Sequence, residues 1–467
     1  MANPHQRLAA LGAAIPEIIL PGPGTDPEKW AVIACDQFTQ DREYWDAARR
    51  TVGDAPSALD LILPEVYLGD PGREERIRRI HRSMERYLGD GTLSPPRRCA
   101  MYIERSTPRH PQRRGLLLAV DLEQYDWSPG ARPLIRSTEG TVPERLPPRM
   151  EVRRGAALEI PHILLLVDDD EDTLLPDLGE RAKQNPPRYE TPLMLGGGSV
   201  KGWALDREAD WDLLAGGLET LARRAGTRYG RQDPAPFLFA VGDGNHSLAT
   251  AKAVWEEYKA AHRGEPGLTE HGARWALVEV ENLYDPAIAF EPIHRVLFGV
   301  RTGEILEVLS RLPGFSTRSI GKDDAPAARA EARKELTRLV GDPGAAGNRL
   351  GLISGGELTL VESGAPGLAT DSLQPLLDAF IAAAPDRPAD AGKVPVSIDY
   401  IHGEEELFRL AGPEAPAPAL GILLPPIRKT GLFETVARSG PLPRKSFSMG
   451  EAVEKRFYFE SRKLFST

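Results

Sequence analysis

The chain has 467 residues, of which 41% are hydrophobic, and a formal net charge of -10 at pH 7. This size is sufficient for two or three domains with sizeable cores, and the acidic balance argues against a protein that binds a long nucleic acid. The two cysteines, Cys35 and Cys99, exclude a disulfide framework and a cysteine-rich metal site. No signal peptide is evident, and the longest strongly apolar segment, 160–167, is too short to span a bilayer. We therefore expect a cytoplasmic protein.

The first candidate site residues follow a predicted strand near the N-terminus. Residues 30–35 (WAVIAC) are apolar enough for a buried strand, and Asp36 and Gln37 come directly after it. Ligand contacts are common at the carboxyl ends of strands in α/β sheets. We expect Asp36 and Gln37 to bind substrate or phosphate; the alternative is an ordinary polar strand end.

A charged loop follows a predicted antiparallel pair of strands. Residues 101–104 and 115–122 have the apolar pattern of such a pair, and the loop 135–145 comes after them. Arg136, Glu139 and Thr141 in this loop are residue types that bind phosphate or move protons. The alternative is a solvated loop rich in charge.

Residues 158–167 (LEIPHILLLV) read as one buried strand that ends in Asp168, Asp169 and Asp170. Three aspartates after a strand can hold Mg²⁺, although acidic strand ends are more often only solubilising. The glycine-rich residues 194–203 predict the turn of a hairpin. They do not form a Walker loop, because the order GxxxxGK[ST] is absent.

The stretch 237–258 (FLFAVGDGNHSLATAKAVWEEY) carries the strongest motif. Residues 237–241 predict a buried strand, 242–245 a turn, and the following residues a helix for which Ser247 is the expected N-cap. Glycines before a helix let a ligand approach the backbone, and the N–H groups of the first helical turn attract anions. The candidate site residues of this turn are Gly242, Asp243, Gly244, Asn245, His246 and Ser247. The alternative is a strand–turn–helix corner made of ordinary turn residues.

The second half of the chain contains fewer chemical motifs. His294 and Arg295 could face an anion or lie on a surface turn, and residues 303–362 predict helices and short strands without evident chemistry. Near the C-terminus a group of cations suggests a small anionic ligand. These cations are Arg428, Lys429, Arg438, Arg444 and Lys445.

Seven ordered segments resemble the bacterial and archaeal domain-of-unknown-function 1015 family. They are WAVIACDQ (30–37), TEGTVPERLPPR (138–149), LEIPHILLL (158–166), GDGNHSLATAK (242–252), PIHRV (292–296), DYIHGEE (399–405) and LPRKSFSMGEAVEKRFYFE (442–460). The resemblance spans nearly the whole chain.

The central motif is also similar to the DGHHR phosphate-binding element of the ParB/sulfiredoxin-like superfamily. Here it reads Asp243 to Ser247, so a serine replaces the arginine. The superfamily includes sulfiredoxins that use ATP, ParB proteins that bind CTP, and free-serine kinases. The resemblance implies a nucleotide phosphate held at the start of a helix.

We expect a mixed α/β (α+β) fold in three parts. Residues 1–300 should form a main mixed-sheet domain that carries the central motif, and 301–393 an inserted α+β subdomain. Residues 394–467 should pack back on the main domain. We therefore expect Asp36, Glu139, Asp243, His246, His294 and Lys445 to line one cleft.

The leading functional hypothesis is phosphoryl transfer by a small-molecule kinase, or phosphate hydrolysis by a phosphatase, on a small hydroxylated metabolite. Serine or O-phosphoserine is the substrate implied by the free-serine kinases. The central turn, Arg136, Arg444 and Lys445 would hold phosphate, while Asp243 or Glu139 would act as base and His246 as proton donor. A nucleotide (ATP or ADP) and Mg²⁺ are the expected cofactors. One alternative is a non-catalytic nucleotide- or metabolite-binding regulator that switches in the way of a ParB protein. The other is a structural protein.

Overall fold

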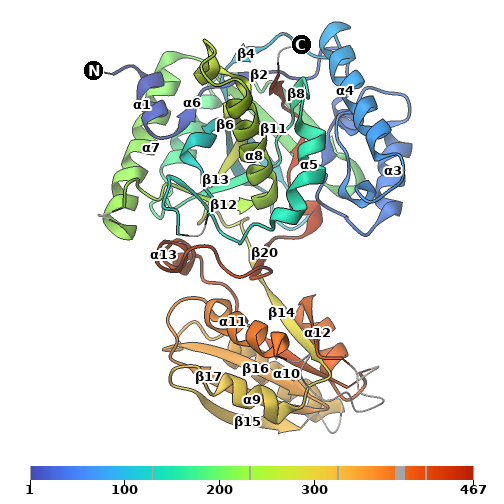
Figure 1. Cartoon of the computed structure of the whole chain (residues 1–467), viewed down its shortest axis with the longest axis vertical. Coiled ribbons are helices and arrows are strands. Elements are labelled where there is room, and N and C mark those ends of the chain that lie inside the picture. The colour runs from blue at the N-terminus through green and yellow to red at the C-terminus, as the bar shows by residue number, and fades with distance from the viewer. Residues whose placement is uncertain are drawn as a thin grey trace. The chain divides into compact units, whose positions relative to one another are not determined.

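The structure, a computed structural model, describes residues 2–128, 130–230, 233–322, 326–383, 395–415 and 418–465. The chain divides into two compact units, of which unit 1 comprises residues 1–289 and 450–467 and unit 2 comprises residues 290–449. Both units combine helices with sheets, so the predicted mixed α/β fold is confirmed (Figure 1). The predicted boundary between residues 393 and 394 lies outside the described residues.

Unit 1 is built on a mixed sheet in the order β10-β11-β5-β6-β13-β9-β12-β7, with β1 added beside β6. Most neighbours are antiparallel, but β13 is parallel to β9 and β12 is parallel to β7. The unit 1 strands are β1 (Ala13–Ala14), β2 (Glu17–Ile18), β3 (Val32–Ile33), β4 (Arg97–Arg98), β5 (Ala100–Ser106), β6 (Arg113–Asp121), β7 (Ile135–Ser137), β8 (Leu158–Glu159), β9 (Leu164–Val167), β10 (Tyr189–Leu193), β11 (Gly198–Leu205), β12 (Phe239–Asp243), β13 (Trp275–Asn282), β21 (Phe457–Tyr458) and β22 (Arg462–Lys463).

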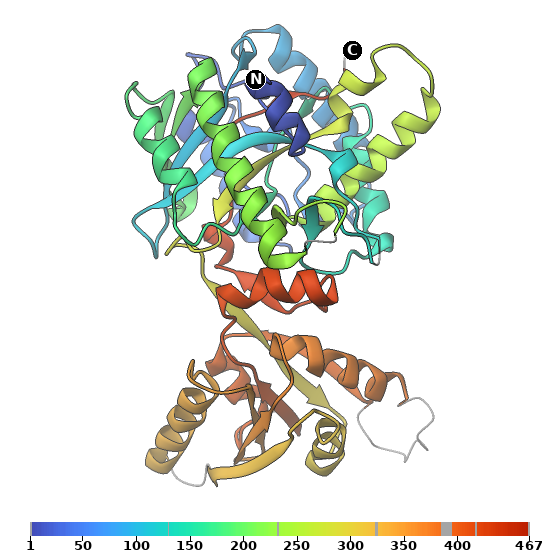
Figure 2. The ribbon, with the colours of Figure 1, turned by 90° about the vertical axis from the view of Figure 1, so that its left-hand side faces the viewer.

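Helices cover this sheet and bury apolar faces against it. The long helix α7 contacts α1 and α6 (Figure 2), and α5 lies beside α8 (Figure 1). The unit 1 helices are α1 (Pro4–Ala10), α2 (Pro27–Trp30), α3 (Arg42–Val52), α4 (Arg73–Gly89), α5 (Leu146–Arg153), α6 (Leu174–Ala182), α7 (Glu208–Tyr229) and α8 (Asn245–Ala261). In α8, Leu248, Ala251, Val254 and Trp255 are buried, which matches the helical spacing in the sequence.

Residues 450–467 return to unit 1 and complete its core. β21 pairs with β3, and β22 pairs with β8. Buried arginines on this segment meet buried glutamates: Arg456 contacts Glu279, and the Arg462 Nε lies 2.5 Å from a Glu159 carboxylate oxygen. A buried charge is tolerated when it is paired, so this C-terminal segment is an integral part of unit 1.

Unit 2 contains a second sheet, in the order β15-β17-β16-β19-β14-β18, with β20 paired to β14. The predicted helices and strands between residues 303 and 362 are confirmed by α9, α10, β16 and β17. The unit 2 elements are α9 (Thr302–Leu309), α10 (Pro326–Val340), α11 (Ala369–Ala382), α12 (Glu404–Ala411), α13 (Lys429–Ser439), β14 (Phe290–Phe298), β15 (Ser316–Lys322), β16 (Asn348–Ser354), β17 (Glu357–Ser363), β18 (Ser397–His402), β19 (Ala419–Leu423) and β20 (Phe447–Met449). In the part of the chain that the structure describes, no helix is both long and apolar enough to cross a membrane.

Two predicted strands differ from those observed. Residues 158–167 form two short strands, β8 and β9, because Pro161 cannot donate to a ladder and the chain leaves the sheet around it. Only Val32 and Ile33 of 30–35 are in a strand, since Trp30 ends helix α2. The hairpin predicted at 194–203 is confirmed by the antiparallel pair β10 and β11, as is the pair β5 and β6.

Candidate functional site

The turn between β12 and α8 places the central motif at the edge of the unit 1 sheet. Strand β12 ends at Asp243, and Gly244 is the N-cap of α8 with a φ of 81°. This left-handed conformation favours glycine, and a Cβ there would also lie 3.2 Å from the Ile163 Cα. Ser247 is the third residue of the helix, so the prediction that it caps α8 is wrong. The helix therefore starts without a side-chain cap, and a helix N-terminus of this kind attracts anions.

Asp243 forms an ion pair that sequence reasoning did not anticipate. Its Oδ2 lies 2.9 Å from the Nζ of Lys455, and its Oδ1 accepts the Gly244 N–H at 3.0 Å. The Lys455 side chain is 9% exposed and that of Asp243 is 24% exposed. The pair adds no net charge at the start of the helix, but an ammonium group has three N–H donors, so Lys455 can also donate to an anion bound there.

His162 connects three segments of unit 1 at the same turn. Its Nε2 lies 2.8 Å from the Ser247 Oγ and 3.7 Å from the Asp36 Oδ2. Its Nδ1 lies 2.9 Å from the Tyr458 hydroxyl, which in turn accepts the Cys35 N–H at 3.0 Å. Asp36 thus lies next to the central motif, and its Oδ1 accepts a hydrogen bond from Gln37 at 2.9 Å.

One arrangement of the hydrogen bonds around His162 makes the Ser247 hydroxyl a donor toward the site. Burial raises the pKa of Tyr458 well above its usual value, so the phenol keeps its proton. Its oxygen accepts the Cys35 N–H, and its proton can be donated to Nδ1 of His162. In that tautomer the ring N–H of His162 is on Nε2 and donates to the Ser247 Oγ, so His162 does not act as a base toward Ser247.

The loop after β7 lies against the central motif. Thr138 donates to the Val241 carbonyl at 2.5 Å and accepts from the Asn245 side chain at 3.4 Å. The Val142 N–H donates to the His246 Nε2 at 3.3 Å. Glu139 and Thr141, in the same loop, are half-buried. Asn245 Oδ1 is buried and accepts no hydrogen bond from any described residue, so the start of α8 contains an unused polar atom.

The guanidinium group of Arg136 is held by other residues of unit 1. Its guanidinium is buried, donates to the Pro133 carbonyl at 3.1 Å, and lies 2.8 Å from the Asp233 carboxylate. It also stacks over the Phe237 ring, 4.6 Å from the ring centroid. Burial lowers the pKa of Arg136, and Asp233 opposes this shift. These contacts occupy the group that we predicted would bind phosphate.

Glu65 is a further carboxyl group near Asp36 that sequence reasoning missed. Burial raises the pKa of Glu65 and the charge of Asp36 adds to this, while Arg149, at 2.5 Å, lowers it. Its backbone N–H donates to the Cys35 carbonyl at 2.8 Å. A half-buried carboxyl whose pKa is raised is a candidate proton acceptor.

Four predicted site residues lie in unit 2. The His294 Nδ1 accepts the Leu424 N–H at 3.1 Å, and burial lowers the pKa of His294 to about 4. Arg295 is fully buried, donates to Gln374 at 2.8 Å and stacks over the Tyr400 ring. Arg444 and Lys445 are exposed before β20. That these residues complete the site of unit 1 stays a prediction.

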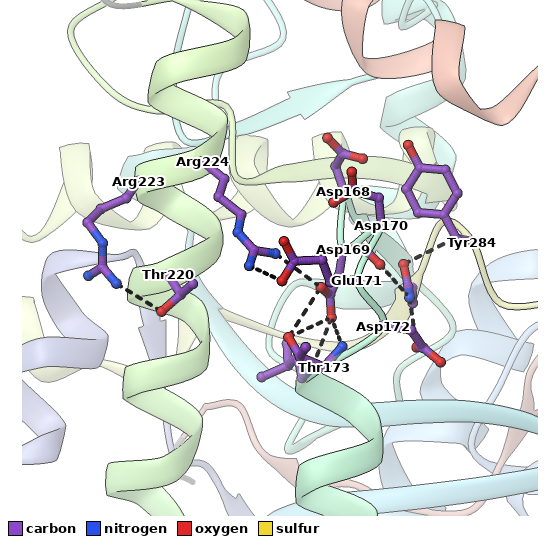
Figure 3. Close-up of polar contacts among 12 residues, drawn as sticks. Asp168, Asp169, Asp170, Glu171, Asp172, Thr173, Thr220, Arg223, Arg224 and Tyr284 are labelled. Carbon is purple, nitrogen blue, oxygen red and sulfur yellow. Dashed lines mark hydrogen bonds and ion pairs between the residues drawn. The ribbon is translucent and has the colours of Figure 1, made fainter.

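The three aspartates after β9 do not fit a Mg²⁺ site. Asp168 and Asp170 lie 2.9 and 2.6 Å from the Arg228 guanidinium. Asp169 accepts the N–H groups of Thr173 and Leu174 at the start of α6, both at 2.8 Å (Figure 3). Within the described ranges, no group of three or more His, Cys, Asp or Glu side chains is placed to hold a metal ion.

The fold and this site define a mixed α/β protein with a polar cluster around an uncapped helix N-terminus. We call this cluster the α8 site; it comprises Asp36, His162, Asp243, Asn245, Ser247, Lys455 and Tyr458. The chain belongs to the DUF1015 family, described as a protein of unknown function, whose sequence profile matches residues 19–368. No curated protein matches the chain significantly in sequence.

Three solved structures are similar to the chain at low identity. A conserved hypothetical protein from Pyrococcus furiosus is 11% identical, with a TM-score of 0.35, and the match covers 74% of this chain and 95% of that one. A free serine kinase in complex with AMP is 11% identical, with a TM-score of 0.36 and coverages of 74% and 92%. SbnI with a C-terminal truncation, from Staphylococcus aureus, is 10% identical, with a TM-score of 0.35 and coverages of 72% and 82%. These superpositions assign no role to any residue of this chain.

Proposed function

We propose that the α8 site holds a phosphate group and that the protein performs phosphoryl transfer or phosphate hydrolysis on a small hydroxylated metabolite. The observation that carries this proposal is the start of α8, where the uncapped first turn of the helix, the Ser247 hydroxyl and the Lys455 ammonium beside Asp243 provide hydrogen-bond donors. Backbone N–H groups, a directed hydroxyl and a cation are the groups that bind phosphate in proteins.

The side chains of the site divide into donors and acceptors. Ser247 and Lys455 would donate to phosphate oxygens, and their fixed positions would stabilise charge on a transferring phosphoryl group without reorganisation. The proton of the substrate hydroxyl would pass to Asp243 or Glu139 as that oxygen forms its bond to phosphorus and the bond from phosphorus to the leaving oxygen of the phosphate donor breaks. His246, whose Nε2 accepts from Val142, would donate through Nδ1 to a phosphate oxygen or to that leaving oxygen.

Serine or O-phosphoserine is the substrate that we favour, on the resemblance of the central motif to free-serine kinases. Asp36 supports an amino-acid substrate, because a half-buried carboxylate beside His162 offers a partner for an ammonium group. A nucleotide, ATP or ADP, would be the phosphate donor or acceptor. Any Mg²⁺ would be bound mainly through phosphate oxygens, and no step above depends on it.

A non-catalytic nucleotide- or metabolite-binding regulator is the second candidate. It is favoured by the pairing of the candidate acid–base groups, since Asp243 is bound to Lys455 and the His246 Nε2 accepts the Val142 N–H. Such a protein would bind phosphate at α8 without turnover.

Turnover separates these two functions. Purified full-length protein is incubated with ATP or ADP and serine, and separately with O-phosphoserine, while ³¹P NMR follows new phosphate esters and free phosphate. The variant Asp243→Asn should abolish turnover, and Asp126→Asn, at an exposed loop aspartate that also accepts a local backbone N–H, should not. Binding without turnover would select the regulator, and the absence of both would overturn the α8 site itself.

A further inference from the structure

Unit 2 contains a small cavity of about 140 Å³ between the starts of helices α11 and α13. A cavity of about 150 Å³ accommodates a benzene-sized molecule, so a phosphate group fits with a short substituent. Its wall combines polar and apolar side chains. The polar ones that bear on its ligand are Asp342, Arg349, Thr370 and Arg428.

Both helices begin at this cavity without a side-chain cap. The N-cap of α11 is Leu368 and that of α13 is Arg428, and neither makes a capping hydrogen bond. The N–H groups of Ala369 and Thr370 find no acceptor within the described part of the chain. Each helix directs the positive end of its dipole toward the cavity, so the two ends reinforce one another.

Thr370 gives independent evidence for a ligand. The residue is 4% exposed and lines the cavity, and its Oγ1 is buried without a hydrogen-bond partner in the described residues. Buried hydroxyl groups are nearly always hydrogen-bonded. The Thr370 hydroxyl lies in the first turn of α11. There it can donate to the same anion that the backbone N–H groups of this turn would bind.

The charges around the cavity favour an anion over a cation. Arg349 lies 3.0 Å from Asp342 and 2.8 Å from Glu362, so its charge is already balanced by carboxylates. Arg428 is exposed at the wall and makes no ion pair with a described residue. Arg428 and the two helix N-termini are therefore the groups that attract an anion to the cavity.

We propose that this cavity is a second anion site, which binds the phosphate group of inorganic phosphate or of a small phosphomonoester. The N–H groups of Ala369 and Thr370 and the Thr370 hydroxyl contact the phosphate oxygens, and Arg428 attracts the anion to the opening. This site is independent of the α8 site, because all its residues lie within unit 2.

Hydrogen exchange of the full-length protein tests this site separately from the α8 site. Inorganic phosphate and O-phosphoserine are titrated in parallel, and peptides covering 365–372 and 426–431 are compared with those covering 243–250. Protection of the unit 2 peptides by both compounds is the expected result, and protection by O-phosphoserine alone would identify a phosphomonoester site. Protection confined to 243–250 would overturn the proposal while leaving the α8 site intact.

Substitutions then test which side chains of the cavity contact the phosphate. Thr370→Val keeps the shape of the side chain and removes its hydroxyl, so half-maximal protection should need about tenfold more phosphate. Arg428→Gln, on an exposed side chain that can change without unfolding unit 2, should also weaken binding and reduce its salt dependence. Thr317→Val, on an exposed strand position of unit 2, is the matched control. Unchanged binding in both Thr370→Val and Arg428→Gln would overturn the assignment.

Discussion

The substitution Tyr458→Phe tests whether a buried phenol controls the proton on Ser247. It removes the donor to Nδ1 of His162 and the acceptor for the Cys35 N–H. The unpaired N–H should cost about 1–3 kcal/mol of unfolding free energy. Without the phenol, His162 can carry its proton on Nδ1 and accept the Ser247 proton at Nε2. The net value of one hydrogen bond, about 1 kcal/mol, then predicts phosphate binding about fivefold weaker.

A second buried tyrosine provides the matched control. The Tyr87 hydroxyl also accepts one backbone N–H, from Ser57 at 3.3 Å, and donates to one side chain, that of Asp60 at 2.7 Å. Tyr87→Phe should therefore reduce stability by a similar amount and leave phosphate affinity unchanged.

The assay is a titration of inorganic phosphate followed by tryptophan fluorescence, since all seven tryptophans lie in unit 1. Tyr458→Phe should have no effect on affinity when Ser247→Ala is already present, because the two act through one hydroxyl. Additive losses in the double variant would refute the proton assignment, as would an equal loss of affinity in Tyr87→Phe.

Three further results are expected. Lys455→Gln should weaken phosphate binding about tenfold, while Lys463→Gln, at an exposed position of the same segment, should not, as measured by the fluorescence titration. Ser247→Ala should lower the unfolding free energy in urea by about 1 kcal/mol, through the lost hydrogen bond with His162 and not through a cap; a loss of the same size when His162→Ala is already present would restore the capping role. The pKa of His294 is lowered from 6.5 to about 4, so between these values the unfolded chain binds more protons than the folded one. The contribution of neutral His294 to the unfolding free energy is therefore complete above about pH 6.5 and decreases toward pH 4; at pH 5 the decrease is about 2 kcal/mol. Hydrogen exchange of unit 2 should show this loss of stability, and His294→Gln should remove the pH dependence.

Local patterns predicted much of the fold. The hairpin at 194–203, the pair β5 and β6, and the buried face of α8 follow from alternation and helical spacing, which depend on neighbouring residues alone. The central motif was found for the same reason, since a turn with two glycines before a helix is local. The capping role of Ser247 was misjudged because Gly244 already provides the left-handed N-cap three residues earlier.

The partners of that motif could not be found in this way. Lys455 and Tyr458 come from a segment more than 200 residues away in sequence, and their contacts depend on strand β21 pairing with β3. Sequence reasoning chose Arg444 and Lys445 in the same basic region, because nothing local distinguishes one cation from another. His162 was hidden inside an apolar run read as one strand, although Pro161 beside it is a recognisable interruption.

The return of residues 450–467 to unit 1 has a consequence for the order in which the protein is made. Lys455, Arg456 and Arg462 provide the positive charges that pair with Asp243, Glu279 and Glu159. These three are translated only after the whole of unit 2 has been translated. Until then a nascent unit 1 lacks these cations, although Glu159 keeps Arg153 as a partner, and strands β3 and β8 lack the neighbours that pair with them. The α8 site therefore cannot exist on a growing chain, and any binding there begins only after synthesis has passed residue 458.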